Sequence, residues 1–73
     1  MLKNLRAMRE DRDLKQRDLA ELLCVHQTTY SDYELGNMNI PNAQLIRLTD
    51  YFGTSVDYLL DRTDDPRPYP RRR

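Results

Sequence analysis

Apolar residues recur along this chain three or four positions apart, the spacing that places side chains on one face of a helix. Leu2, Leu5 and Met8 form the first such stripe. Four further apolar groups follow it, so five short helices are predicted. The second helix is expected to cover about Gln16–Leu23 and the third about Gln27–Leu35.

Residues that favour helix ends fall between these groups. Gly36 and Gly53 stand where the third and fourth helices should end, because glycine tolerates the left-handed backbone found just past a helix. Asn42 and Ser55 are expected to cap the starts of the fourth and fifth helices through their side-chain oxygens. No segment of useful length alternates apolar and polar residues, so no sheet is predicted and the fold class is all-α.

The chain has 73 residues, enough for one small domain. The five predicted helices should pack into a bundle over residues 1–60, whereas the last segment, 61–73, has few apolar side chains to bury. Prolines at positions 66, 68 and 70 lack a backbone donor and block helix formation there. We therefore expect a helical domain followed by an extended or disordered tail rich in proline and arginine.

Composition narrows the classes of function. The single cysteine cannot form an internal disulfide, and cysteine and histidine are too few for a zinc site. No apolar run is long enough for a membrane span, and the N-terminal residues contain no apolar block of signal-peptide type. The sequence predicts a cytoplasmic protein with no metal, no cofactor and no membrane contact.

The charges balance overall but are unevenly placed. Four of the twelve basic side chains lie at positions 67–73, so residues 1–66 carry eight basic and twelve acidic side chains, a net charge of −4. No lysine or arginine occurs between Arg17 and Arg47. Because phosphate neutralisation dominates DNA affinity, this gap predicts modest affinity for any nucleic-acid interface in the core alone.

The most informative segment runs from Gln16 to Gly36. It holds two short helical patterns separated by about three residues, and the small side chain of Ala20 lets the second helix approach the first. Two such helices must cross steeply, as in a helix-turn-helix, whose second helix can lie in the major groove of DNA. Base edges in that groove distinguish all four base pairs.

The sequence resembles the Cro/phage-repressor (Xre) type of helix-turn-helix protein over about residues 5–60. The matching pieces are Leu5-Arg6-Ala7-Met8-Arg9, Leu14-x-Gln16-x-x-Leu19-Ala20, Val25-x-Gln27, Tyr33-Glu34-x-Gly36, Ile40-Pro41 and the run from Tyr51 to Leu60. The resemblance implies a five-helix bundle of the lambda-repressor-like type and sequence-specific binding of double-stranded DNA. It also implies a transcriptional regulator, expected to be a repressor, that acts as a homodimer on a palindromic operator.

The resemblance also assigns residues that read bases. Gln27 and Thr28 fall at the start of the recognition helix, and Asp32 falls on the same face. Glutamine can pair with adenine, a threonine methyl can meet a thymine methyl, and aspartate can accept from cytosine N4. The alternative for each is a solvated polar side chain.

A second set of residues is assigned to the DNA backbone. Gln16 matches a position that touches a phosphate beside a helix N-terminus, where free amides favour an anion. Thr29 and Ser31 could donate to phosphates from the recognition helix. Asn37 and Asn39 lie in the following loop, where the family commonly has lysine or arginine, and they can donate hydrogen bonds but carry no charge.

Other positions in the resemblance are structural. Arg9 and Glu34 match a pair that forms a salt bridge between the first helix and the recognition helix, and Tyr30 is expected to fill the core. Asp13 and Cys24 stand where the family often has glycine, so both are expected to adopt a left-handed backbone, at a cost of about 1 kcal/mol for Cys24.

Two surfaces have open interpretations. Arg67, Arg71, Arg72 and Arg73 form either an arm that binds DNA or a solubilising charged end. Exposed apolar residues near the end of the bundle are candidates for the dimer surface, the alternative being that they belong to the monomer core; they are Tyr51, Tyr58 and Leu60.

Two rival functions remain at this point. The net negative core and the uncharged loop also suit an antitoxin or another module that grips a protein partner, and a structural module without nucleic-acid activity is a further possibility. An enzyme is not expected, because Cys24 and His26 lie two residues apart in a turn, without a loop that could stabilise an oxyanion.

Overall fold

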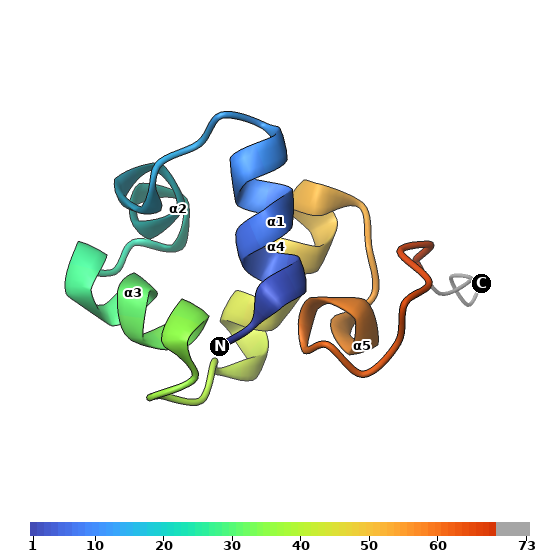
Figure 1. Cartoon of the computed structure of the whole chain (residues 1–73). Helices are drawn as coiled ribbons and strands as arrows, with labels where there is room; N and C mark the ends of the chain where they lie inside the picture. The colour runs from blue at the N-terminus through green and yellow to red at the C-terminus, as the bar shows by residue number, and fades with distance from the viewer. Residues whose placement is uncertain (69–73) are drawn as a thin grey trace.

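The computed structural model describes residues 1–68, which fold into five α-helices without any strand (Figure 1). The helices are α1 (Lys3–Asp11), α2 (Gln16–Leu23), α3 (Gln27–Leu35), α4 (Asn42–Phe52) and α5 (Val56–Leu59). The predicted all-α five-helix fold is confirmed, and the bounds of α2 and α3 agree with those expected. None of the helices in residues 1–68 is long and apolar enough to cross a bilayer.

The core lies between α1 and the other four helices. Figure 1 shows α1 near the centre, with α2 and α3 on one side and α5 on the other. The fully buried side chains come from all five helices and are Leu5, Leu19, Leu23, Tyr30, Leu48 and Leu59. Their removal from water is the main force that holds these short helices together, since helices of this length are marginal alone.

Two residues other than glycine have a left-handed backbone in the connections on either side of α2. Asp13 (φ 55°) lies between α1 and α2, and Cys24 (φ 56°) lies at the C-terminal end of α2. Both residues therefore have the backbone that the family resemblance predicts. At Cys24 this backbone costs about 1 kcal/mol relative to an ordinary conformation, because its Cβ atom crowds the following carbonyl, whereas aspartate tolerates it better.

The helix starts agree with the sequence only in part. Ser55 caps α5, its hydroxyl oxygen accepting from the Tyr58 amide at 3.1 Å, as expected. The expected cap at Asn42 is wrong, because Pro41 occupies the N-cap position and Asn42 is the first residue of α4. Pro41 already has the extended backbone that precedes a helix (φ −58°, ψ 151°), so α4 begins at once after it.

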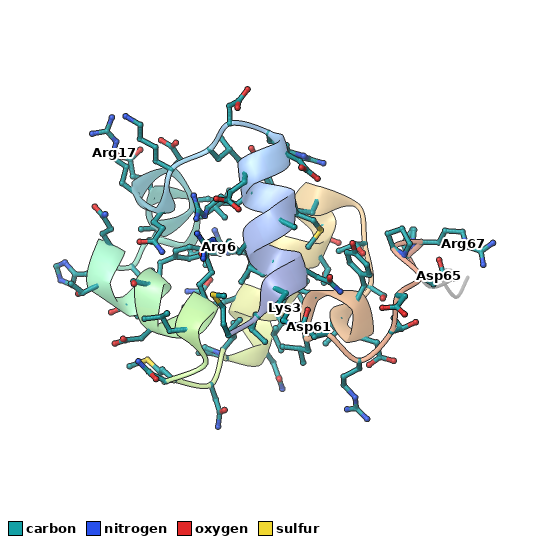
Figure 2. All side chains as sticks on the ribbon, viewed as in Figure 1. Lys3, Arg6, Arg17, Asp61, Asp65 and Arg67 are labelled. Carbon is teal, nitrogen blue, oxygen red and sulfur yellow. The ribbon has the colours of Figure 1, made fainter. Side chains whose placement is uncertain are left out.

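The start of α1 is capped from the other end of the chain. The Asp61 carboxylate accepts from the backbone amides of Lys3 (2.7 Å) and Asn4 (2.8 Å), which Leu2 at the N-cap does not satisfy. Figure 2 shows Lys3 and Asp61 side by side. A carboxylate at this place satisfies free amides and interacts favourably with the helix dipole, so Asp61 joins α1 to the end of α5.

Beyond Asp61 the described chain contains no helix. It contacts the bundle where the Asn4 side chain donates to the carbonyl of Thr63 at 3.5 Å and where the Thr54 hydroxyl donates to the carbonyl of Pro66 at 2.7 Å. The expectation of an extended or disordered tail also covered positions 69–73, which lie outside the described residues.

Candidate DNA-binding surface

Helices α2 and α3 form a compact unit joined by a short turn, Cys24–His26. The Val25 amide donates to the carbonyl of Ala20 at 3.0 Å, and Ala20 itself is buried, so the turn folds tightly against α2. In Figure 1 α2 is viewed almost end on while α3 runs across the view, so the two helices cross steeply. This is the arrangement that presents the second helix to a groove.

The two sides of α3 differ in burial. Tyr30, Tyr33 and Glu34 point inward and are between 0 and 3% exposed. Gln27 and Thr28 are exposed at the start of the helix, and Asp32 is half-buried one turn further on. The three residues predicted to read bases therefore share the outer part of α3, and none is buried in the interior.

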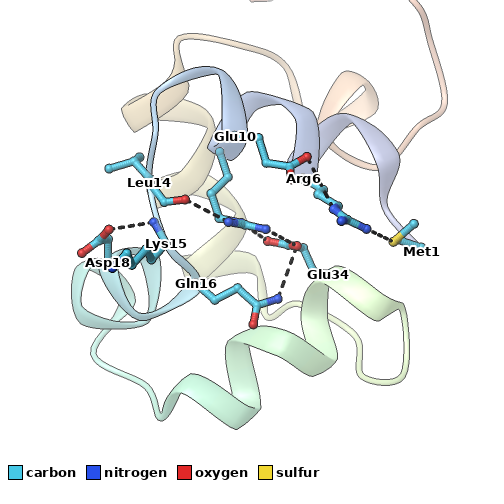
Figure 3. Close-up of polar contacts among 9 residues, drawn as sticks. Met1, Arg6, Glu10, Leu14, Lys15, Gln16, Asp18 and Glu34 are labelled. Carbon is cyan, nitrogen blue, oxygen red and sulfur yellow. Dashed lines mark hydrogen bonds and ion pairs between the residues drawn. The ribbon is translucent and has the colours of Figure 1, made fainter.

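The inward side of α3 is anchored by an ion pair to α1. The Arg9 guanidinium donates to both carboxylate oxygens of Glu34, at 2.7 and 3.2 Å, and to the Leu14 carbonyl at 2.9 Å (Figure 3). Both side chains are nearly removed from solvent, with exposures of 12% for Arg9 and 3% for Glu34. A bidentate pair of this kind fixes the orientation of both partners.

Burial and hydrogen bonding shift the pKa values of Glu34 and Tyr30. Burial alone would raise the pKa of Glu34, but the hydrogen bonds from its neighbours and the charge of Arg9 together outweigh burial and hold that pKa below the ordinary value of 4.5. Burial raises the pKa of the Tyr30 phenol. The Tyr30 hydroxyl is buried close to the Glu34 carboxylate but forms no hydrogen bond of good geometry within residues 1–68.

Gln16 joins the start of α2 to this anchor. Its side-chain amide lies 3.5 Å from a carboxylate oxygen of Glu34, a long hydrogen bond (Figure 3). An amide group carries two hydrogens, so one can face Glu34 while the other is directed outward. The half-buried side chain of Gln16 is thus held at the outer edge between α2 and α3.

The remaining predicted backbone contacts lie along α3 and the loop after it. Thr29 and Ser31 are half-buried, on either side of the buried Tyr30. Asn37 and Asn39 are exposed in the loop. The backbone amide of Asn37 donates to the backbone carbonyl of Asp32 at 3.0 Å. All four polar side chains lie on α3 or directly beyond its C-terminal end.

Sequence reasoning did not single out two exposed apolar side chains on this surface. Leu35 is 49% exposed at the last position of α3, and Met38 is 45% exposed in the loop. Leu35 follows Thr28 by seven residues and Asp32 by three, so helical spacing alone could have placed it on the outer side of α3.

The other candidate residues lie away from α3. Tyr51 is 41% exposed, and the Arg12 guanidinium lies over its ring at 5.3 Å from the centroid. Tyr58 and Leu60 are half-buried, and Leu60 packs against the core. In the tail, Arg67 pairs with Asp65 at 2.8 Å. The other three tail arginines, at positions 71, 72 and 73, lie outside the described residues.

Comparisons with known proteins point to one family. The Helix-turn-helix family matches residues 5–59. Two uncharacterised HTH-type transcriptional regulators of Bacillus subtilis (strain 168) are similar: YobD is 35% identical over 94% of this chain and 62% of its own length, and YqaE is 33% identical over 78% and 49%. A crystal structure of a transcriptional regulator from Listeria innocua is similar with a TM-score of 0.78 and 33% identity, over 88% of this chain and 60% of that one. The chain thus spans half to three-fifths of the length of these relatives.

Proposed function

The chain belongs to the helix-turn-helix family of DNA-binding transcriptional regulators, and we propose that it binds specific sequences of double-stranded DNA through α3. The observation that carries this proposal is the division of α3 into two sides. Glu34 and Tyr30 fix the helix from within, while Gln27 and Thr28 remain exposed on a rigid rod. The major groove is wide enough to admit one such helix.

In this proposal the outer residues of α3 read base edges. Gln27, at the first position of the helix, pairs with adenine through its amide, and the methyl group of Thr28 contacts a thymine methyl. Asp32 accepts from cytosine N4. The negative charge of Asp32 also repels phosphates, so orientations in which α3 lies against the phosphate backbone of DNA are unfavourable.

The backbone contacts lie on both sides of the reading residues. Gln16 donates its outward amide hydrogen to a phosphate near the start of α2, while Thr29 and Ser31 donate hydroxyl hydrogens. Asn37 and Asn39 donate on the loop side. These contacts position α3 but carry no base information, and being uncharged they release few counterions.

We further assign the chain a homodimeric repressor role. A dimer with two-fold symmetry would place two α3 helices in successive major grooves, about 34 Å apart, on a palindromic operator. The exposed ring of Tyr51 supports a dimer surface at the end of α4, whereas Tyr58 and Leu60, the other two candidates, are half-buried and offer less apolar surface. Occupation of a promoter by such a dimer would exclude polymerase, so repression is the expected sign.

The proposal is tested by binding to duplex DNA. The protein should bind random duplex with modest affinity at 50 mM salt and lose affinity toward 200 mM, because phosphate contacts dominate non-specific binding. Selection of bound fragments from a random pool should then yield two half-sites in inverted orientation. A folded protein that binds no duplex at low salt would refute the proposal.

One observation favours a protein-binding alternative. Leu35 and Met38 expose apolar surface at the end of α3 and in the loop after it, two segments that contain no lysine or arginine. A partner protein, such as the toxin of an antitoxin, would bury this patch more readily than DNA would. Substitution of both residues by serine separates the functions: it should leave duplex binding nearly unchanged if α3 reads DNA, and abolish partner binding if the patch is a protein interface.

A further inference from the structure

The DNA-facing surface has an uncharged end. Neither α3 nor the loop that follows it contains a lysine or arginine, since none occurs between Arg17 and Arg47. At the other end of the surface, Lys15 and Arg17 are exposed at the start of α2. A helix in the major groove has a phosphate backbone on each side, so the loop side needs a cation from another element.

The packing of α1 against α3 places a cation beside the loop that follows α3. The Leu2 amide donates to the carbonyl of Glu34 at 2.8 Å, and the Arg9 side chain binds the Glu34 carboxylate. Arg6 follows Leu2 by four residues and precedes Arg9 by three, so all three lie on the side of α1 that faces the C-terminal end of α3.

The contacts of Arg6 place its charge near the loop. The guanidinium donates to the sulfur of Met1 at 3.5 Å, and the Met1 nitrogen lies 3.8 Å from the position that a Cβ atom at Gly36 would occupy. Figure 3 shows Arg6 extending toward Met1, on the side of the molecule where α3 ends. The Arg6 charge therefore lies beside the start of the uncharged loop.

Arg6 is also free to change partner. Its pair with Glu10 is long, 3.5 Å, and both side chains are about half exposed, 47% and 54%. An exposed pair of this kind contributes little to stability, whereas a guanidinium bound to a phosphate forms strong charge-assisted hydrogen bonds. Arg6 can therefore leave Glu10 and bind a phosphate at little cost in the free energy of unfolding.

We propose that Arg6 is a DNA-backbone contact, which binds a phosphate on the loop side of α3 and supplies the charge that α3 and its loop lack. This inference rests on the proposed function, because it needs α3 to lie in a groove. It assigns to α1, which otherwise only supports the motif, a direct part in DNA affinity.

The test compares Arg6→Gln with a matched control, Arg62→Gln. Both variants remove one positive charge, but Arg62 follows α5, on the opposite side of α1 from α3 (Figure 1). Affinity for random duplex is measured between 50 and 200 mM salt by fluorescence anisotropy. Urea unfolding of each variant shows that it is folded, and Arg6→Lys serves as the conservative replacement.

Each Arg6 that contacts a phosphate contributes about 0.9 to the slope of log affinity against log salt, or about eightfold in affinity at 0.1 M. Arg6→Gln should lose this amount, Arg6→Lys should retain most of it, and Arg62→Gln should change it far less. Equal losses for Arg6→Gln and Arg62→Gln, or no rescue by lysine, would overturn the inference. Failure of the unmodified protein to bind duplex would instead refute the proposed function.

Discussion

Facing inward, α3 carries two tyrosines and a glutamate that are almost completely buried; facing outward, it carries Gln27 and Thr28, which are exposed. The inward side is tied by an ion pair and by packing, so its residues determine how α3 is oriented. The outward side makes few contacts within the protein, so its residues are free to vary without loss of the fold. In the proposed function, the same helix thus separates stability from recognition.

The charges follow the same division. The inward side has a buried cation and anion that satisfy each other, Arg9 and Glu34. The outward side has one acidic residue, Asp32, and no cation of its own. In the proposed function, recognition and affinity are supplied by different elements: α3 provides the groups that read bases, while flanking helices provide charge for the phosphates.

The largest effect on the inward side should come from Glu34→Ala. It leaves Arg9 mostly buried without its partner, and breaking such a pair costs about 3 kcal/mol of the free energy of unfolding. Urea denaturation at neutral pH measures the loss. Glu10→Ala, which removes an acid from the exposed pair with Arg6, should cost no more than about 0.5 kcal/mol. Equal losses in the two variants would contradict the distinction between the two pairs.

On the outward side, Gln27→Ala should leave unfolding within about 0.5 kcal/mol of the unmodified protein. It should cost about 1–3 kcal/mol of binding free energy on the selected site while sparing random duplex, because only a base contact is lost. A matched control is Gln44→Ala. The Gln44 side chain donates to the carbonyl of Leu23 at 2.9 Å, so its loss should lower stability and not specificity. An equal loss for Gln27→Ala on every DNA sequence would rule out base reading by this residue.

A smaller effect on stability, of opposite sign, is expected on the inward side of α3. Tyr30→Phe removes a buried hydroxyl that has no partner in the described structure, and should stabilise the protein by about 1 kcal/mol without changing DNA affinity. Thermal and urea unfolding both measure the change. A loss of stability would show that the hydroxyl is satisfied by a bound water or by Glu34.

The smallest effect should appear with pH, since burial opposes the hydrogen bonds that lower the pKa of Glu34. A carboxyl whose pKa is lowered by folding stabilises the protein above its unfolded pKa, and this contribution disappears as pH falls through the folded value, below 4.5. The difference in stability between the unmodified protein and Glu34→Gln should therefore narrow from pH 7 to pH 3. A difference that widens in acid would contradict the lowered pKa.

The sequence predicted the parts of this molecule that depend on local spacing. The bounds of α2 and α3 follow from apolar periodicity, and the place of Gln27 and Thr28 at the start of α3 followed from the family resemblance. The left-handed backbone at Cys24 followed from comparison with a family pattern in which glycine is common.

Features that depend on how distant elements pack could not be predicted in this way. Asp61 caps α1 across most of the length of the chain, and no local pattern marks a carboxylate for a helix that begins 58 residues earlier. The position of Arg6 beside the end of α3 depends on the register between two helices, which their separate periodicities leave undetermined. The contact between Gln16 and Glu34 has the same origin.

The most direct test of the central claim is a titration of the protein with its selected duplex, followed through backbone amide NMR shifts. If α3 reads DNA, the largest changes should lie at Gln27–Asp32, at Gln16 and in the loop that contains Asn37 and Asn39. Changes confined to α4 and α5, with the amides of α3 unmoved, would contradict the claim.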